Sequence, residues 1–218
     1  MLENYSKRLK YIRDLFAHQN PYLEKIDLTI RKNDLPIHIE PEEGKLLQLL
    51  IKLSNAKKIV EIGTLAGYST IWMAEALITE DSKIYTIEHD PERQKLAEES
   101  FANYSNNHRI SLLKGNAKKI LPSLNEQAPF DMIFIDADKP GYNSYLDWAE
   151  ENIKYGGLII ADDTFLSEAV YLEELPSKIK QSTRDLMNEF NRRLADSSKY
   201  QSIMIPNERG LTIAIKCF

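Results

Sequence analysis

The sequence predicts an α/β fold, built as a doubly wound, mostly parallel seven-stranded sheet with an antiparallel C-terminal strand pair and extra N-terminal helices. Short apolar runs rich in β-branched residues alternate with amphipathic segments along most of the chain. That alternation is typical of parallel strands joined by right-handed helical crossovers. The last two apolar runs, 200–205 and 211–216, are separated only by a turn-like stretch, so they predict an antiparallel pair.

Length and composition limit what the protein does. At 218 residues the chain fits one domain, with N-terminal helices over residues 1–53 and the sheet core over residues 54–218. The net charge of −5 disfavours unaided binding to nucleic acids or anionic membranes. A single cysteine, Cys217, allows no intrachain disulfide and no cysteine-ligated zinc site, which fits a reducing compartment. The first residues lack the apolar core of a signal peptide, and no apolar run is long enough to span a membrane, so we expect a cytoplasmic protein.

The N-terminal region predicts helices. Apolar residues recur at helical spacing in the first segment, and this stripe comprises Leu2, Tyr5, Leu9, Ile12 and Phe16. Such a stripe has to be covered, either by packing on the same domain or, equally, in a dimer contact or as a lid, where the helix covers a second copy of the chain or helps to roof its site. The second alternative leads us to expect a homodimer. A weaker helix follows over residues 22–35, and a third contains Leu46, Leu47, Leu49, Leu50 and Leu53.

The stretch 59–70 organises the rest of the chain. A buried, β-branched run ends at Gly63, and Gly67 and Ser69 follow at the start of a helix. Helix starts offer unpaired backbone N–H groups, and glycine lets a ligand approach the main chain closely, so this turn suits a cofactor. The strand also delivers Glu61 to the mouth of the turn. The two glycines are four residues apart with no third at the required place, which disfavours a pyrophosphate cradle.

The next strand, over Lys83–Glu88, provides a second part of the cofactor site. It ends in Glu88, which follows Gly67 by 21 residues, about where an α/β nucleotide site places the acid that binds the ribose hydroxyls. A helix opens at Pro91. Beyond it we expect strands at 109–114, 130–136 and 155–163, a short helix capped by Asn116, and a long helix from Ser182.

Acidic residues close several of these strands. Ligands bind outside the carboxyl ends of the strands in such sheets, so we expect one crevice to contain Glu61, Glu88, Asp136, Asp162 and Asp163. Converging carboxylates call for a counter-charge, and Mg²⁺ suits them because it prefers oxygen ligands. The competing interpretation is that Lys139 and nearby basic groups neutralise the acids. No histidine or cysteine lies in the two turns that carry the aspartates, so zinc is disfavoured.

These motifs together resemble the cation-dependent class I S-adenosylmethionine O-methyltransferases, the group of the catechol and caffeoyl-CoA O-methyltransferases and their small bacterial relatives. The resemblance covers residues 36–165 and rests on several motifs: E-I-G-T-L-A-G-Y-S from Glu61, the acid Glu88, G-N-A from Gly115, I-H-I-E from Ile37, and F-I-D-A-D-K from Phe134. It implies a Rossmann-like fold with S-adenosylmethionine as cofactor. The cofactor-binding residues that it implies are Ile39, Glu61, Gly63, Thr64, Gly67, Ser69, Glu88, His89, Ala117 and Asp136.

The resemblance also implies a reaction. A divalent cation, Mg²⁺ or else Mn²⁺ or Ca²⁺, would be held by Asp136, Asp162 and Asp163, and Lys139 would be the catalytic base instead of an ion-pair partner of Asp136 or Asp138. The implied substrate is a catechol-like aromatic diol, of which one hydroxyl receives the methyl group. Asp163 departs from the family, which usually has Asn there. Its added charge should strengthen cation binding but leave less positive charge to acidify the substrate hydroxyl.

Three alternatives stay open on the sequence. A methyltransferase on the same scaffold can act without metal on another small molecule, a protein or an RNA. A nicotinamide-dependent oxidoreductase is compatible with Glu88 but is opposed by the glycine spacing. A non-catalytic binding protein would keep the cofactor pocket without turnover. The charged segment 165–181 resembles the family's substrate-side insertion only in position, so the sequence does not identify the methyl acceptor.

Overall fold

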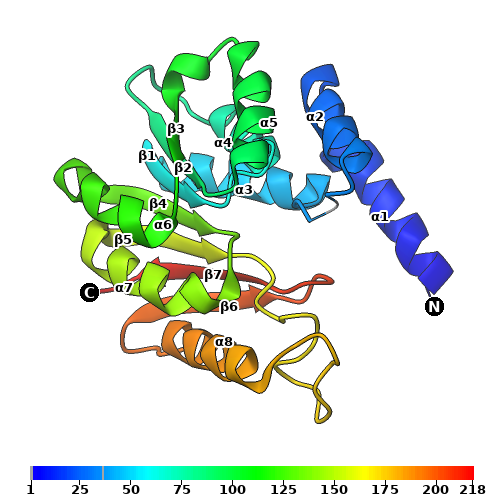
Figure 1. Cartoon of the computed structure of the whole chain (residues 1–218), viewed down its shortest axis with the longest axis vertical. Helices are drawn as coiled ribbons and strands as arrows, with labels where there is room; N and C mark the ends of the chain where they lie inside the picture. The colour runs from blue at the N-terminus through cyan, green and yellow to red at the C-terminus, as the bar shows by residue number, and fades with distance from the viewer. Residues whose placement is uncertain (1, 36) are drawn as a thin grey trace.

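A computed structural model describes residues 2–35 and 37–218, with side chains from Lys7 onward. Its centre is a seven-stranded sheet in the order β3-β2-β1-β4-β5-β7-β6 (Figure 1). Strand β7 runs antiparallel to both of its neighbours, and the other adjacent pairs are parallel. The predicted fold class is confirmed, and its strands are β1 (Lys58–Ile62), β2 (Lys83–Glu88), β3 (Ile110–Lys114), β4 (Phe130–Ile135), β5 (Ile153–Ala161), β6 (Tyr200–Ile205) and β7 (Leu211–Lys216).

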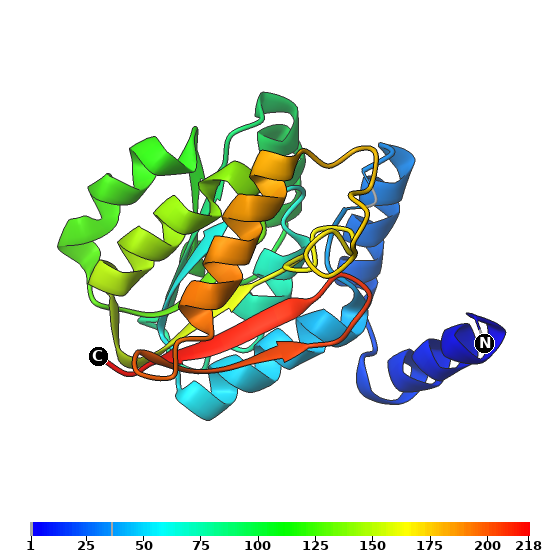
Figure 2. The same cartoon turned by 90° about the horizontal axis from the view of Figure 1, so that it is seen from below.

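Helices cover both faces of this sheet (Figures 1 and 2). One face packs against α2 (Pro21–Lys32), α3 (Pro41–Ser54), α4 (Tyr68–Ala74) and α5 (Pro91–Ala102), and the other against α6 (Ala117–Ile120), α7 (Tyr142–Asn152) and α8 (Gln181–Leu194). Strand side chains alternate between the two cores, so that in β1 Ile59 faces the first group of helices and Val60 the second. In the described part of the chain, no helix is long and apolar enough to cross a membrane.

Helix α1 (Leu2–Phe16) extends away from the rest of the molecule (Figure 2). Its connection to the body includes Arg13, whose guanidinium lies 2.8 Å from a carboxylate oxygen of Glu40 and 2.7 Å from one of Glu42. These ion pairs link α1 to the start of α3, while most of the helix surface faces outward.

The apolar stripe of α1 is only partly covered. Leu9 and Ile12 are half-buried, whereas Phe16 is 66% exposed. The side chains of Leu2 and Tyr5, also expected in the stripe, lie outside the described residues. Packing on the same domain, the first of the two expectations for this helix, therefore accounts for only part of the stripe.

Strand β5 begins at Ile153 and differs at both ends from the expected range 155–163. It ends at Ala161, so Asp162 and Asp163 follow the strand and do not belong to it. Gly156 and Gly157 lie inside the strand, where the pairing of β5 with β4 shifts register and Gly156 has a φ of +74°. A glycine in the left-handed region accommodates such an irregularity in a strand without the strain that a Cβ would add.

Candidate active site

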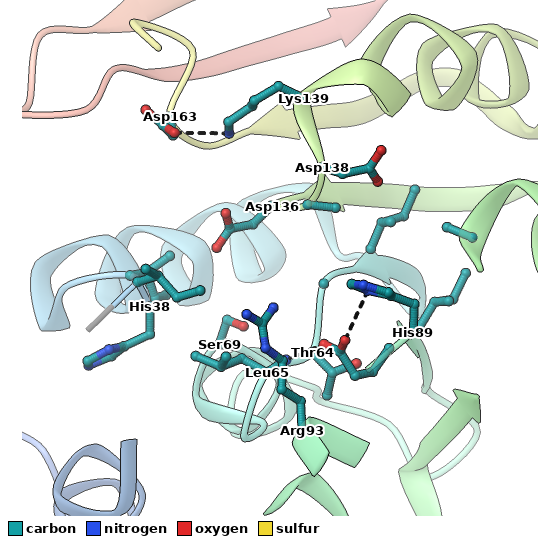
Figure 3. A pocket seen from close by; sticks show the side chains of 18 of the residues that line it. His38, Thr64, Leu65, Ser69, His89, Arg93, Asp136, Asp138, Lys139 and Asp163 are labelled. Atoms are coloured by element: carbon teal, nitrogen blue, oxygen red, sulfur yellow. Dashed lines mark hydrogen bonds and ion pairs between the residues drawn. The ribbon is translucent and has the colours of Figure 1, made fainter. Parts of the chain in front are cut away.

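A cavity of about 770 Å³ opens at the carboxyl ends of the parallel strands (Figure 3). Lys139 and Asp163 line it at one end, and Figure 3 shows Asp136 between this pair and Ser69. The structure thus places the expected catalytic base in the same space as most of the expected cofactor residues. Those that line the cavity are Ile39, Gly63, Thr64, Ser69, Glu88, His89, Ala117 and Asp136.

The two glycines of the turn after β1 are required by contacts inside the protein. Gly63 has a φ of +100°, and a Cβ placed on it would overlap the backbone oxygen of Asp136. Gly67 has a φ of +85°, and a Cβ on it would overlap the ring of Phe101 in α5. Only Gly63 lines the cavity. Gly67 makes room for Phe101, and its contact with the cofactor stays an expectation.

Glu61 lies beneath the turn and not at its mouth, so this expectation is wrong. Its carboxylate is fully buried and accepts hydrogen bonds from the hydroxyls of Ser69 and Thr70, each at 2.5 Å. Strand alternation is the reason, since Glu61 points to the sheet face that α4 covers. Burial raises the pKa of Glu61 to about 7, although the hydroxyl hydrogen bonds lower it. Glu61 thus holds the start of α4 in place, including Ser69, which lines the cavity.

Glu88 is buried at the end of β2 and lines the cavity. One carboxylate oxygen accepts a hydrogen bond from the backbone N–H of Leu65 and the other from that of Asp90, both at 2.9 Å. These bonds fix the turn after β1 against β2, and each oxygen keeps a second lone pair for a ligand hydroxyl. The side chain of His89 is 67% exposed at the cavity edge, with Nδ1 3.3 Å from Glu88 Oε1 (Figure 3).

Asp136 and Asp162 follow the ends of the neighbouring strands β4 and β5. Asp162 is fully buried, and among the described residues neither of its carboxylate oxygens has a hydrogen-bond partner. Burial and then repulsion from Asp162 raise the pKa of Asp136 to about 7, and burial raises the pKa of Asp162. Crowded, buried carboxylates are costly unless a positive charge lies close to them. These two residues therefore fit a dication that takes oxygen ligands.

Asp163 turns toward Lys139. Its Oδ2 lies 3.2 Å from Lys139 Nζ, which also donates to Tyr142 Oη at 2.6 Å and to the backbone oxygen of Asp162 at 3.2 Å. The ion-pair partner of Lys139 is thus Asp163, and not Asp136 or Asp138. In the part of the chain that the structure describes, no three histidine, cysteine or acidic side chains are already arranged to hold a metal ion.

Two residues outside the predicted crevice belong to the same cluster. Glu43, in the first turn of α3, is 7% exposed, and burial followed by repulsion from Asp162 raises its pKa to about 7. Arg209, between β6 and β7, lines the cavity, and its Nη2 lies 3.3 Å from Asp162 Oδ2. In the sequence they have the appearance of a helix-capping acid and a turn residue. The predicted crevice contains several acidic residues and only one named basic residue, Lys139. This imbalance of charge was the sign in the sequence that a further cationic group lies near the acids.

Comparison with known proteins places the chain in a family. The family model for O-methyltransferases matches residues 14–217. The chain belongs to the O-methyltransferase family. It is similar to the catechol O-methyltransferase of Niastella koreensis, with 37% identity over 213 residues that cover 94% of each protein. It is also similar to caffeoyl-CoA O-methyltransferase 2 of Populus trichocarpa, with 34% identity over 178 residues, covering 79% of this chain and 72% of that protein.

Solved structures support the assignment of this chain to the O-methyltransferase family. TomG from Streptomyces achromogenes, an O-methyltransferase of tomaymycin synthesis in complex with SAM, has a TM-score of 0.84 and 32% identity and covers 95% of each chain. An O-methyltransferase from Bacillus cereus in complex with SAH has a TM-score of 0.88 and 27% identity, covering 99% of this chain and 100% of that one. The protein is an S-adenosylmethionine-dependent O-methyltransferase, and the nicotinamide-dependent alternative is wrong.

The end of the cavity near Lys139 is polar in this O-methyltransferase. Asp138, Tyr145 and Ser167 line it there, and Tyr145 Oη donates a hydrogen bond to Asp138 Oδ1 at 2.5 Å. Burial raises the pKa of Tyr145, so its hydroxyl stays a donor. Ser167 belongs to the segment between β5 and α8, in which Leu166, Ser167 and Glu168 all have positive φ values. The charged segment 165–181 thus reaches the cavity through Ser167.

Proposed function

We propose that this O-methyltransferase transfers the methyl group of S-adenosylmethionine to one hydroxyl of a catechol-like small molecule, assisted by a divalent cation. The observation that carries the proposal is Asp162, a fully buried aspartate whose two oxygens lack hydrogen-bond partners in the described chain and which follows the strand beside Asp136. Both acids belong to the cluster around Lys139. The name of the relative from Niastella koreensis supports the same class of acceptor.

Residues at the two ends of the cavity have different roles in this proposal. We expect Ile39, Ser69, Glu88 and His89, which line the cavity, to bind and orient the cofactor. Asp136 and Asp163 also line the cavity, and we expect them to hold the cation together with Asp162, which is buried behind its wall. When bound, the cation lowers the pKa of a substrate hydroxyl and S-adenosylmethionine supplies the methyl group.

Lys139 Nζ is the atom that we expect to accept the proton of that hydroxyl. Tyr142 Oη and the backbone oxygen of Asp162 hold Nζ against the cavity wall at 2.6 and 3.2 Å. Because both substrates and the base meet in one cavity, proximity and orientation contribute to the rate in addition to the proton transfer.

A panel of catechols with labelled S-adenosylmethionine tests the proposal. Rates would be measured against Mg²⁺ concentration for the wild type, Asp136→Asn and Asp162→Asn. We expect saturable dependence on Mg²⁺ in the wild type and a loss of at least about a hundredfold in both variants, because each removes a charged ligand. Asp131→Asn is the matched control: Asp131 lies at the opposite end of β4 and accepts hydrogen bonds from the backbone N–H groups of Lys57 and Lys58.

The second candidate is a metal-independent methyltransferase acting on another small molecule, a protein or an RNA. The ion pair between Lys139 and Asp163 favours it, because it already neutralises one of the three expected ligands. Full activity in a chelator, or an Asp136→Asn variant as active as the wild type, would establish this candidate in place of the first.

We also infer that the protein is a homodimer working in the cytoplasm. Tyr11, Leu15 and Phe16 of the protruding helix α1 are 65%, 54% and 66% exposed, and a second copy of the chain is the partner expected to cover them. Small-angle scattering over a concentration series would show a dimer that Phe16→Glu weakens. A monomer at high concentration would contradict the inference.

A further inference from the structure

Arg209 holds a position that methyl transfer by itself does not explain. Its Nη2 lies between two buried acids, 3.3 Å from Asp162 Oδ2 and 3.5 Å from Glu43 Oε2. The same guanidinium donates hydrogen bonds to the backbone oxygen of His38 at 2.9 Å and to that of Ile37 at 3.4 Å. One side chain from the β6–β7 loop thus reaches the acid that follows β5, the first turn of α3 and the segment that lines the cofactor side of the cavity.

The charges around Arg209 account for its place. Glu43, Asp136, Asp162 and Asp163 bring four carboxylates together, and Lys139 neutralises Asp163 by direct contact. Asp162 has no hydrogen-bond partner among the described residues, so Arg209 is the cationic group in direct contact with it. A buried carboxylate needs such a charge when no other cation is bound.

The contact also sets up a competition. Arg209 touches Oδ2 of Asp162, a residue that we expect to hold the dication, and two cations on the same carboxylate repel each other. We propose that Arg209 is an internal counter-cation of the acid cluster, which competes with the divalent cation for Asp162 and withdraws from it when the cation binds. This proposal rests on the proposed cation site, and it assigns Arg209 the role of a positioning residue that tunes cation affinity.

The structure supplies variants that separate charge from folding. Arg209→Gln removes the positive charge and keeps a hydrogen-bond donor, and the segment 37–38 retains a second anchor because His38 Nε2 lies 2.8 Å from Asp27 Oδ1. Arg209→Lys keeps the charge. Arg193 offers a matched reference within the wild type. Its side chain is 25% exposed, against 28% for that of Arg209, and it is ion-paired to Asp147 and Glu150.

The first experiment uses the wild type alone and does not depend on a variant that folds. Modification by phenylglyoxal, located by peptide mass spectrometry, would be compared with and without Mn²⁺. We expect Arg209 to react several times faster once Mn²⁺ displaces it from Asp162, while Arg193 keeps its rate. An Arg209 rate that Mn²⁺ leaves unchanged, although calorimetry shows Mn²⁺ bound, would overturn the proposal.

The second experiment measures Mn²⁺ affinity by calorimetry without substrate. We expect Arg209→Gln to bind Mn²⁺ at least about tenfold more tightly than the wild type and Arg209→Lys to stay within a few-fold, because only the first removes the repelling charge. Arg209→Gln should also unfold at a lower temperature without metal, and Mn²⁺ should raise its midpoint more than that of the wild type. Equal affinities in all three proteins would overturn the role of Arg209 and leave the cation site intact. Absence of Mn²⁺ binding in all three would overturn the cation site and, with it, this proposal.

Discussion

Lys139 Nζ lies 3.2 Å from Asp163 Oδ2, so the expected catalytic base is paired with the one expected cation ligand that departs from the family pattern. Both side chains are largely buried, at 15% and 27% exposure, and they face the cavity in which the cofactor is expected. Asp163 has a φ of +52°, in the left-handed region that Asn tolerates as well as Asp does. The exchange to the residue usual in the family is therefore compatible with the backbone of this chain.

Asp163→Asn is predicted to weaken cation binding and to preserve turnover. The amide oxygen remains a ligand, but the site loses one negative charge, so we expect Mg²⁺ affinity to fall by about tenfold and the rate at saturating Mg²⁺ to stay near that of the wild type or rise. Rate against Mg²⁺ concentration measures both quantities. Asp163→Ala is the control, because it also removes the oxygen and should lose turnover. An Asn variant that is inactive at any Mg²⁺ concentration would show that the carboxylate is needed for its contact with Lys139.

Glu61→Gln is predicted to change how stability depends on pH. The buried carboxyl has its pKa raised to about 7, against 4.5 for an ordinary glutamate, so the folded state keeps a proton that the unfolded state has lost between these values. The free energy of unfolding of the wild type should therefore fall as pH rises through this window and level off above it. Because Gln does not titrate, the variant should gain about 2–3 kcal/mol relative to the wild type between pH 5 and pH 8. Urea unfolding at several pH values, without cofactor, measures this difference, and a difference independent of pH would contradict it.

Gly63→Ala is predicted to destabilise the protein by at least about 3 kcal/mol, because the new Cβ overlaps the backbone oxygen of Asp136 in addition to the strain of positive φ. Gly156→Ala isolates the second effect. Gly156 also has positive φ, but no heavy atom lies within 4 Å of the added Cβ, so we expect a loss of only about 1 kcal/mol. Urea unfolding of the two variants compares these losses. Equal losses would mean that the close approach of Gly63 to the backbone of Asp136 is not the reason why position 63 requires glycine.

The sequence predicted the sheet and the residues at its carboxyl edge because both follow from local patterns. Parallel strands end at one edge, so Glu88, Asp136 and Asp162 were expected near each other. The position of Glu61 was predictable as well, but a stricter rule was needed. Alternation along β1 directs this side chain under α4, whereas its position near the end of the strand had suggested the mouth of the turn.

The rest of the acid cluster depends on tertiary contacts that no local pattern marks. Glu43 forms a capping box with Glu40, which fully explains its presence in the sequence. Its side chain nevertheless accepts a hydrogen bond from Asn207 in the β6–β7 loop, 164 residues away. Arg209 enters from the same loop, and only the packing of α3 and this loop on the end of β5 brings both residues to Asp162.

Glu88 is the residue for which a cofactor role and a structural role have to be separated by experiment. Its carboxylate accepts hydrogen bonds from the backbone N–H groups of Leu65 and Asp90, so Glu88→Ala should lose stability as well as cofactor affinity. Glu88→Gln keeps one acceptor oxygen and should lose mainly affinity. A charge-assisted hydrogen bond to a ribose hydroxyl is worth about 1.5–3 kcal/mol, so the loss of one such bond predicts roughly 10- to 150-fold weaker binding in both variants.

Calorimetry with S-adenosylhomocysteine and thermal unfolding of the same samples measure the two effects of Glu88 separately. His89→Ala is the control for stability, because its ring is 67% exposed and its contact with Glu88 Oε1 is at the surface, so the unfolding midpoint should change little. If Glu88→Gln binds the cofactor as tightly as the wild type while its unfolding midpoint drops, Glu88 holds the turn after β1 and does not bind the ribose. If affinity falls with little change in the midpoint, the charge of Glu88 acts on the cofactor directly, because the remaining amide oxygen is enough to keep the turn in place.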